Sequence, residues 1–200
     1  TYMPPLLPFE IDDLTETYIA DNQVYSFHYP KDWNIEQQGD WRTSLIKKEG
    51  NRPSVFVNMS IAPISKAVSS IEDMLSERVR RIVLELTDEE IADESDIPLS
   101  MFYLNGRPVV QAGGDNLYSG VIMSLILNES YSATIISVGK SRYAEQLEAG
   151  TLTIASTLQI IEAQFEDISI DLSNLTQTYQ DDESSIEFRH PPEWQVFKVG

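Results

Sequence analysis

The segment Val24-Tyr25-Ser26-Phe27-His28-Tyr29-Pro30-Lys31-Asp32-Trp33 joins a run of alternating aromatic residues to a Pro-x-x-Trp sequence. Its aromatic side chains at 25, 27 and 29 share one side of an extended backbone, because successive side chains of a strand point to opposite faces. Pro30 lacks the backbone N–H that a sheet ladder needs, so the strand is expected to end there. The sequence therefore predicts a half-buried strand over 24–29, with Trp33 packing back onto the sheet.

The same pattern occurs a second time, 161 residues further along the chain. Residues 14–35 and 175–196 align without a gap and share 8 identities in 22 positions, more than unrelated segments share by chance. The matched residues of the first copy are Leu14, Thr15, Thr17, Tyr18, Asp21, Phe27, Pro30 and Trp33. We therefore predict a proline-rich, linker-like N-terminus over 1–11, one complete domain over 12–170, and the start of a second, truncated copy over 171–200.

Between these copies the sequence alternates strand patterns with turn signals. Asn105-Gly106 predicts a tight type I′ hairpin turn, because both residues tolerate positive φ. The short turns favour antiparallel neighbours, since parallel strands need long crossovers. The expected strands are Thr43–Lys47, Ser54–Ile61, Met101–Leu104, Pro108–Ala112, Leu117–Leu127 and Tyr131–Val138.

Two helices are expected. The first follows the capping pattern Ser69-Ser70-Ile71-Glu72, in which the Ser69 hydroxyl and the Glu72 carboxylate satisfy free backbone donors. Apolar residues then recur at helical spacing as far as Leu86, and we expect the opposite face to be solvated. On or beside that face lie Arg78, Arg80 and Arg81, interpreted as salt-bridge partners and not as an anion site. The second helix is predicted over 141–158.

The order of elements is strands, helix, hairpin strands and helix. This order indicates an α+β fold, in which helices pack on a mostly antiparallel sheet. A doubly wound parallel sheet is excluded by the tight hairpins.

The aromatic strand that leads into Tyr29-Pro30-Lys31-Asp32-Trp33 resembles the opening of PsbP-like domains, named for an extrinsic protein of photosystem II. The closing element Ile154-Ala155-Ser156-Thr157-Leu158 also resembles that family, and the resemblance covers residues 14–162 and the copy at 175–200. It implies an α/β/α sandwich with a central, mostly antiparallel sheet of about six strands flanked by helices. Ran-binding Mog-type proteins and some effector chaperones share this fold. Family members mostly act as non-catalytic binding or assembly modules outside the cytoplasm.

Charge excludes several kinds of partner. The chain has 14 Lys+Arg and 32 Asp+Glu, a formal net charge of −18. Neutralising phosphates needs a surplus of basic residues, so we expect no nucleic acid and no anionic membrane face as partner.

The chain has no cysteine, which excludes thiol catalysis and Cys-ligated zinc. No apolar run is long enough to span a bilayer, although a parent protein with a membrane or lipid anchor stays open.

Trp41 and Tyr118 are the candidate partner-binding residues. Unlike Trp33, they are aromatic residues with no counterpart in the repeat, and an exposed aromatic side chain near a loop can anchor a protein partner. The alternative, buried packing, stays open for both.

The densest acidic stretch, 88–96, is the candidate metal site. Its carboxylates Asp88, Glu89, Asp93 and Asp96 offer the oxygen ligands that Ca²⁺ or Mn²⁺ prefers. The spacing lacks the Asp-x-Asp-x-Asp-Gly pattern of a calcium loop, so a solvated acidic loop is the competing interpretation.

No catalytic arrangement is evident. The two histidines, His28 and His190, fall at different columns of the repeat, and no Gly-x-Ser-x-Gly sequence occurs. We therefore expect no enzyme and no cofactor, but a non-catalytic, extracytoplasmic PsbP-like binding or assembly module from a tandem-repeat protein, with a protein partner. The alternatives are a divalent-metal-responsive domain that uses residues 88–96, and a cytoplasmic Mog-like regulator or effector chaperone.

Overall fold

The computed structural model describes residues 10–65, 70–86, 96–113, 120–140, 143–161, 176–181, 186–190 and 192. The chain forms two compact units, residues 1–163 and 164–200. Each unit is described by itself below.

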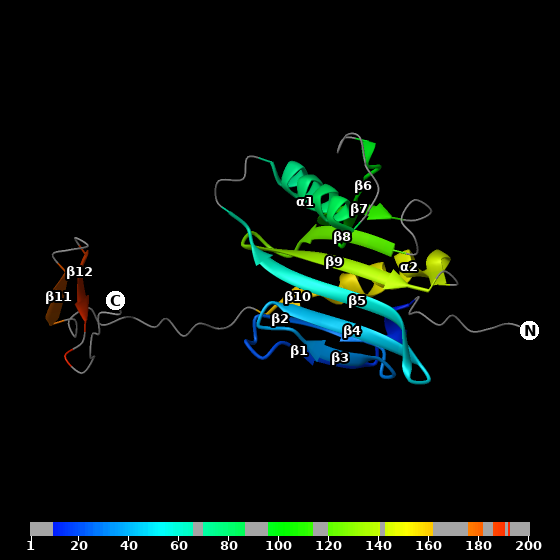
Figure 1. The fold of residues 1–200 in the computed structure, drawn as a ribbon, viewed down its shortest axis with the longest axis horizontal. Helices are drawn as coiled ribbons and strands as arrows, with labels where there is room; N and C mark the ends of the chain where they lie inside the picture. Colours follow the sequence, from blue (N-terminus) through cyan, green and yellow to red (C-terminus); the bar gives the residue numbers. More distant parts are fainter. Residues whose placement is uncertain are drawn as a thin grey trace, which may run out of the picture. The chain divides into compact units, whose positions relative to one another are not determined.

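The first unit contains one large antiparallel sheet (Figure 1). Its seven strands lie in the order β3-β4-β5-β9-β8-β7-β6. Their bounds are β3 Asn34–Gln37, β4 Arg42–Glu49, β5 Arg52–Pro63, β6 Ser100–Leu104, β7 Arg107–Gly113, β8 Gly120–Ile126 and β9 Tyr131–Gly139. The α+β class and the mostly antiparallel sheet predicted from the sequence are thereby confirmed.

The predicted strand over 24–29 lies outside this large sheet. It is β2 (Tyr25–Tyr29), which pairs with β1 (Glu16–Ile19) and with β10 (Gln159–Ile160) in a separate three-stranded sheet. Alternation along the sequence identifies a strand but not the sheet that it joins, which explains the difference from a single sheet of about six strands.

The two helices cover different faces of the large sheet. Helix α2 (Ala144–Thr157) contacts β2, β8 and β9, and its Leu147, Ile154 and Ala155 belong to the main core with Tyr25 and Phe27. Helix α1 (Ile71–Leu86) contacts β7 and β8 and buries its Leu75, Val79 and Val83 in a second core on the other face. The result is a layered arrangement with the large sheet between the helices.

The start of α1 corrects one detail of the sequence prediction. The capping hydroxyl belongs to Ser70, because the Asp73 backbone N–H donates to Ser70 Oγ at 3.2 Å. Ser69, the predicted cap, lies outside the described residues. The cap is shifted by one position because the helix begins at Ile71, which makes Ser70 the residue just before it.

The predicted hairpin turn at Asn105-Gly106 connects β6 and β7. Both residues have positive φ, 52° and 76°. Those angles are the type I′ conformation that the Asn-Gly pair favours.

The second unit contains a hairpin of β11 (Gln177–Asp181) and β12 (Ile186–His190). Its register pairs Thr178 with Arg189 and Tyr179 with Phe188. In the first unit, β1 and β2 pair Thr17 with His28 and Tyr18 with Phe27, the same positions 161 residues earlier. The two hairpins therefore share one pairing register.

Candidate functional site

One half of the large sheet has a face that no described helix covers. Along β5, Val57, Met59 and Ile61 point into the main core, whereas Phe56, Asn58 and Ser60 point to the opposite face. This split follows from the alternation of side chains along a strand. Helix α1 lies on the same side, but it packs mainly on β7 and β8 and reaches β9 through the Arg78–Ser132 hydrogen bond. We call the remaining part, formed by β3, β4, β5 and β9, the open face.

Strand register arranges the open face in rows. Asn58 lies opposite Ser44 of β4 and Ile136 of β9. Side chains of adjacent strands at paired positions are neighbours on the same face. The next row towards one end of the strands contains Phe56, opposite Ile46 and Val138, and the next row towards the other end contains Ser60, opposite Arg42 and Thr134.

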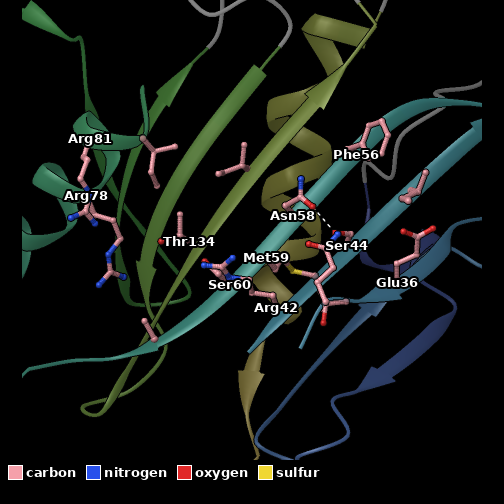
Figure 2. Close-up of a pocket in the computed structure, with 16 residues that line it drawn as sticks. Glu36, Arg42, Ser44, Phe56, Asn58, Met59, Ser60, Arg78, Arg81 and Thr134 are labelled. Atoms are coloured by element: carbon pink, nitrogen blue, oxygen red, sulfur yellow. Dashed lines mark hydrogen bonds between the residues drawn. The ribbon is translucent and has the colours of Figure 1, made fainter. Parts of the chain in front are cut away.

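The open face and the side of α1 enclose a groove of about 730 Å³ (Figure 2). Arg78 and Arg81 extend from α1 at one side of the groove, and Glu36 of β3 lies at the other side. The lining residues are Glu36, Gln38, Arg42, Thr43, Ser44, Ile46, Phe56, Asn58, Met59, Ser60, Ala62, Arg78, Arg81, Ile82, Thr134 and Ile136. A volume of this size lies within the range of ligand-binding sites in proteins.

One end of the groove is apolar and accessible. The Phe56 side chain is 36 % exposed, and Val138, its paired neighbour on β9, is 44 % exposed. Large hydrophobic side chains on a sheet face are usually covered, so adjacent exposed ones mark a surface that can bury a partner.

The middle of the groove carries a polar pair. The Ser44 hydroxyl donates a hydrogen bond of 2.5 Å to Asn58 Oδ1. Asn58 lines the groove, and its side-chain NH₂ group, which takes no part in this hydrogen bond, supplies donors that a ligand can use. Because the Ser44 hydroxyl is bonded to an amide oxygen and not to a base, this pair has the character of a recognition element and not of an activated nucleophile.

Arg78 is the most constrained cation of the groove. Its Nη1 donates to Ser132 Oγ at 2.7 Å, and this serine in turn donates to the Ala62 backbone oxygen. Burial lowers the pKa of Arg78, and the positive charge of Arg81 lowers it further. A carboxylate ligand would stabilise the charged form of Arg78 and would thereby offset the effects of burial and of Arg81 on its pKa.

None of the three groove arginines has a carboxylate partner in the described part of the chain. The ion pairs found there join Lys47 to Asp32 at 3.0 Å and Lys140 to Glu49 at 2.9 Å. Arg42, Arg78 and Arg81 take part in neither pair. The groove therefore gathers positive charge on a chain whose net charge is −18.

Trp41, predicted as a partner-binding residue, lies next to the groove. It is 36 % exposed and stacks on Tyr131, with ring centroids 5.7 Å apart and planes inclined by 21°. The two rings line a smaller cavity of about 430 Å³ that shares Arg42, Ser60 and Ala62 with the groove. Trp41 is therefore partly exposed and partly packed, a combination typical of aromatic anchors at interfaces.

The other predicted site residues do not join this site. Tyr118 and the carboxylates Asp88, Glu89 and Asp93 lie outside the described residues. Asp96 is described and exposed. Within the described ranges, no three His, Asp or Glu side chains gather closely enough to hold a metal ion.

The sequence interprets Arg78 as a salt-bridge partner on or beside the solvated face of the helix. In the described part of the chain it is half-buried and bonds to Ser132 in place of a carboxylate. Helical spacing contains the signal that was missed. Arg78 lies four residues after Met74 and four before Ile82, both half-buried, so all three share one side of α1.

Comparisons with known proteins give similarity of structure only. No family model matches the sequence, and no curated protein matches it. The structure is similar to the solution structure of cyanobacterial PsbP (CyanoP) from Synechocystis sp. PCC 6803, with a TM-score of 0.49 and 14 % identity over 74 % of this chain and 94 % of that one.

A second similarity is to a crystal structure from Bacteroides thetaiotaomicron VPI-5482. Its TM-score is 0.45, with 12 % identity over 74 % of this chain and 49 % of that chain. This chain therefore spans about half the length of the Bacteroides protein. At such identities both similarities concern the fold alone.

Proposed function

We propose that this chain is a non-catalytic binding or assembly module that holds a protein partner in the groove of the open face. The observation that carries the proposal is the uncovered half of the large sheet, where exposed Phe56 and Val138 lie at one end of a groove whose arginines have no carboxylate partner in the described residues. Folding usually covers apolar sheet faces, so an uncovered one that also carries charge is best explained by a partner that covers it.

The chemistry of the groove favours binding over catalysis. Among the described residues that line it there is no histidine, and Glu36 is the single carboxylate. General acid–base or nucleophilic catalysis needs a base within hydrogen-bonding distance of the group that it activates. The Ser44 hydroxyl, in the middle of the groove, donates to the Asn58 amide oxygen and not to a base.

We also propose that the chain is one unit of a tandem-repeat protein that works outside the cytoplasm. The shared pairing register of the β1–β2 and β11–β12 hairpins supports the tandem arrangement. The extracytoplasmic location rests on the PsbP-like opening sequence. Within the described residues, no helix is both long and apolar enough to cross a bilayer.

Site-specific photo-crosslinking in the source cells tests the binding function. A benzophenone amino acid at position 56 or 41 is expected to form an adduct of one defined size. The same group at Tyr103, which is 71 % exposed on β6, serves as the matched control and is expected to form none. Excess wild-type chain should suppress the adduct, whereas a chain with Ser60→Trp, which fills the groove, should not.

Equal adducts at all three positions would contradict the proposal, because they would indicate nonspecific contact with the whole surface and not binding in the groove. Turnover of any substrate in a panel of hydrolase assays, abolished by Ser44→Ala but not by Ser60→Ala, would contradict the non-catalytic part.

A further inference from the structure

We infer that the groove binds an extended, acidic segment of a partner protein, which carries an apolar residue four positions before its first carboxylate. This inference rests on the proposed binding function and names the ligand class. It follows from the charge of the groove and from the spacing of its parts.

The groove is locally basic on a strongly acidic chain. The chain has 18 more acidic than basic residues, yet the described residues that line the groove include three arginines and one glutamate. Arg78 is partly desolvated and lies near Arg81. The free protein therefore already carries the unfavourable electrostatic free energy of two neighbouring cations. A carboxylate between them gains charge-assisted hydrogen bonds and relieves the repulsion.

The apolar and basic parts of the groove are spaced along β5. Phe56 marks the apolar end, Ser60 lies opposite Arg42, and Ala62 lies opposite Ser132, the hydrogen-bond partner of Arg78. Along β5, at about 3.3 Å per residue, the row of Phe56 lies about 13 Å from the row of Arg42 and about 20 Å from the row of Ser132, the residue that Arg78 contacts.

An extended ligand reproduces these distances with the same spacing. Side chains at positions 1, 5 and 7 of an extended peptide point to one side and span the same lengths, because alternate residues share a face. A helix rises only 1.5 Å per residue and would need about nine residues for the shorter distance. The ligand that fits is therefore an extended peptide with an apolar residue at position 1 and carboxylates at 5 and 7.

Other anions fit less well. A nucleic acid or an anionic membrane extends far beyond the groove and would meet the overall negative charge of the chain. A free phosphate ion would engage the arginines but leave the apolar end at Phe56 uncovered.

A pair of labelled peptides with identical composition tests the inference. The matched peptide is acetyl-Leu-Ser-Ser-Ser-Glu-Ser-Glu-amide, and the shifted peptide is acetyl-Leu-Ser-Ser-Glu-Ser-Glu-Ser-amide, whose carboxylates point to the other side of an extended chain. Fluorescence anisotropy with the full 200-residue protein is expected to show that the matched peptide binds at least about tenfold more tightly, the difference that one charge-assisted hydrogen bond supplies.

Single substitutions locate the binding site. Arg42→Gln and Arg78→Gln are each expected to weaken binding of the matched peptide about tenfold. Arg52→Gln, at an exposed arginine of β5 outside the groove, is the control and should leave binding unchanged. Since Arg78 also bonds to Ser132, its substitution can disturb folding, so the exposed Arg42 decides the outcome.

Four results would overturn the inference. Equal binding of the two peptides would remove the spacing requirement, and full displacement by an equal concentration of inorganic phosphate would indicate a small-anion site. Binding only by a chain in which the acidic residues of 88–96 are replaced by amides would indicate that this stretch occupies the groove itself. If both peptides fail while the adducts at positions 56 and 41 persist, the ligand class is wrong and the binding function stands.

Discussion

Tyr25 is a fully buried tyrosine whose hydroxyl lies 2.7 Å from Thr43 Oγ1. Burial raises its pKa above the ordinary 10.0, and this effect exceeds the opposing effect of the Thr43 hydrogen bond. A raised pKa means that the folded chain keeps the phenolic proton where the unfolded chain loses it. The contribution of Tyr25 to stability is therefore fully present below pH 10 and is lost as the pH rises from 10 through the folded-state pKa.

Tyr25→Phe tests this effect at the residue scale. We expect it to cost about 1 kcal/mol of unfolding free energy at pH 7, because the hydrogen bond to Thr43 is lost. Between pH 9 and 11 the variant should lose stability less steeply than the wild type. Urea unfolding across this pH range measures both effects, with the exposed Tyr103→Phe as control. Parallel pH profiles for the wild type and Tyr25→Phe would refute the prediction.

Residue patterns predicted which side chains of β2 point inward, but not how fully β2 is enclosed. Tyr25 and Phe27 are buried as the alternation indicates, yet Ser26 between them is also buried. Gln159 of β10 donates to its hydroxyl at 3.2 Å. A strand 133 residues away in the sequence covers this position, and local alternation contains no information on such a partner.

At the scale of elements, the β6–β7 turn caps the end of α2. Arg107 Nη1 donates to the Leu158 backbone oxygen at 2.6 Å, and its Nη2 donates to the Ala155 and Ser156 oxygens at 3.3 and 3.4 Å. Asn105 Nδ2 donates to the Ser156 oxygen at 3.1 Å. The last carbonyls of a helix lack partners within it, and a cation there also interacts favourably with the helix dipole.

Arg107→Met is therefore expected to destabilise the domain by about 2 kcal/mol, the contribution of hydrogen bonds from a charged donor. The shift of the urea midpoint measures it. Arg52→Met, at an exposed arginine, is the matched control and should stay within about 0.5 kcal/mol of the wild type.

Asn105→Gly removes the capping amide of the turn without changing the turn conformation. Glycine accepts the positive φ of this position but lacks the amide, so we expect a loss of about 1 kcal/mol with an intact hairpin. A wild-type midpoint for both Arg107→Met and Asn105→Gly would contradict the capping role.

The sequence predicted the type of the Asn105-Gly106 turn but not the contacts of this turn with α2. Asn105-Gly106 specifies the backbone angles of the hairpin by itself, since few residues accept two positive φ values in succession. Its contact with α2 joins residues about fifty positions apart, and only the completed fold brings them together. The groove was missed for the same reason, because helical spacing places Arg78 beside apolar neighbours without indicating which strands α1 leaves uncovered.

At the scale of the whole molecule, the net charge of −18 dominates the response to ions. Self-repulsion of like charges destabilises a compact state, and salt screens it. We expect Ca²⁺, Mn²⁺ and Zn²⁺ to raise the thermal midpoint of the EDTA-treated chain by small and similar amounts.

A saturable rise with one metal would instead support the metal-responsive alternative, since a ligand at a hundredfold excess over Kd stabilises by about 2.7 kcal/mol. In that case Asp93→Asn combined with Asp96→Asn should abolish the rise. Thermal unfolding by circular dichroism distinguishes the two results.

The pairing of β5 with β9 has a consequence for the order of folding. Every other neighbouring pair in the large sheet follows directly along the chain, whereas β5 and β9 pair residues from 63 with 131 to 55 with 139. Local hairpins form early, and a contact across so long a loop forms late because of its entropic cost. Asn58 and Ser60 face Ile136 and Thr134 across this pairing, so the groove is complete only when β5 and β9 have paired. A partner that fits the groove therefore binds only chains in which this long-range pairing has formed.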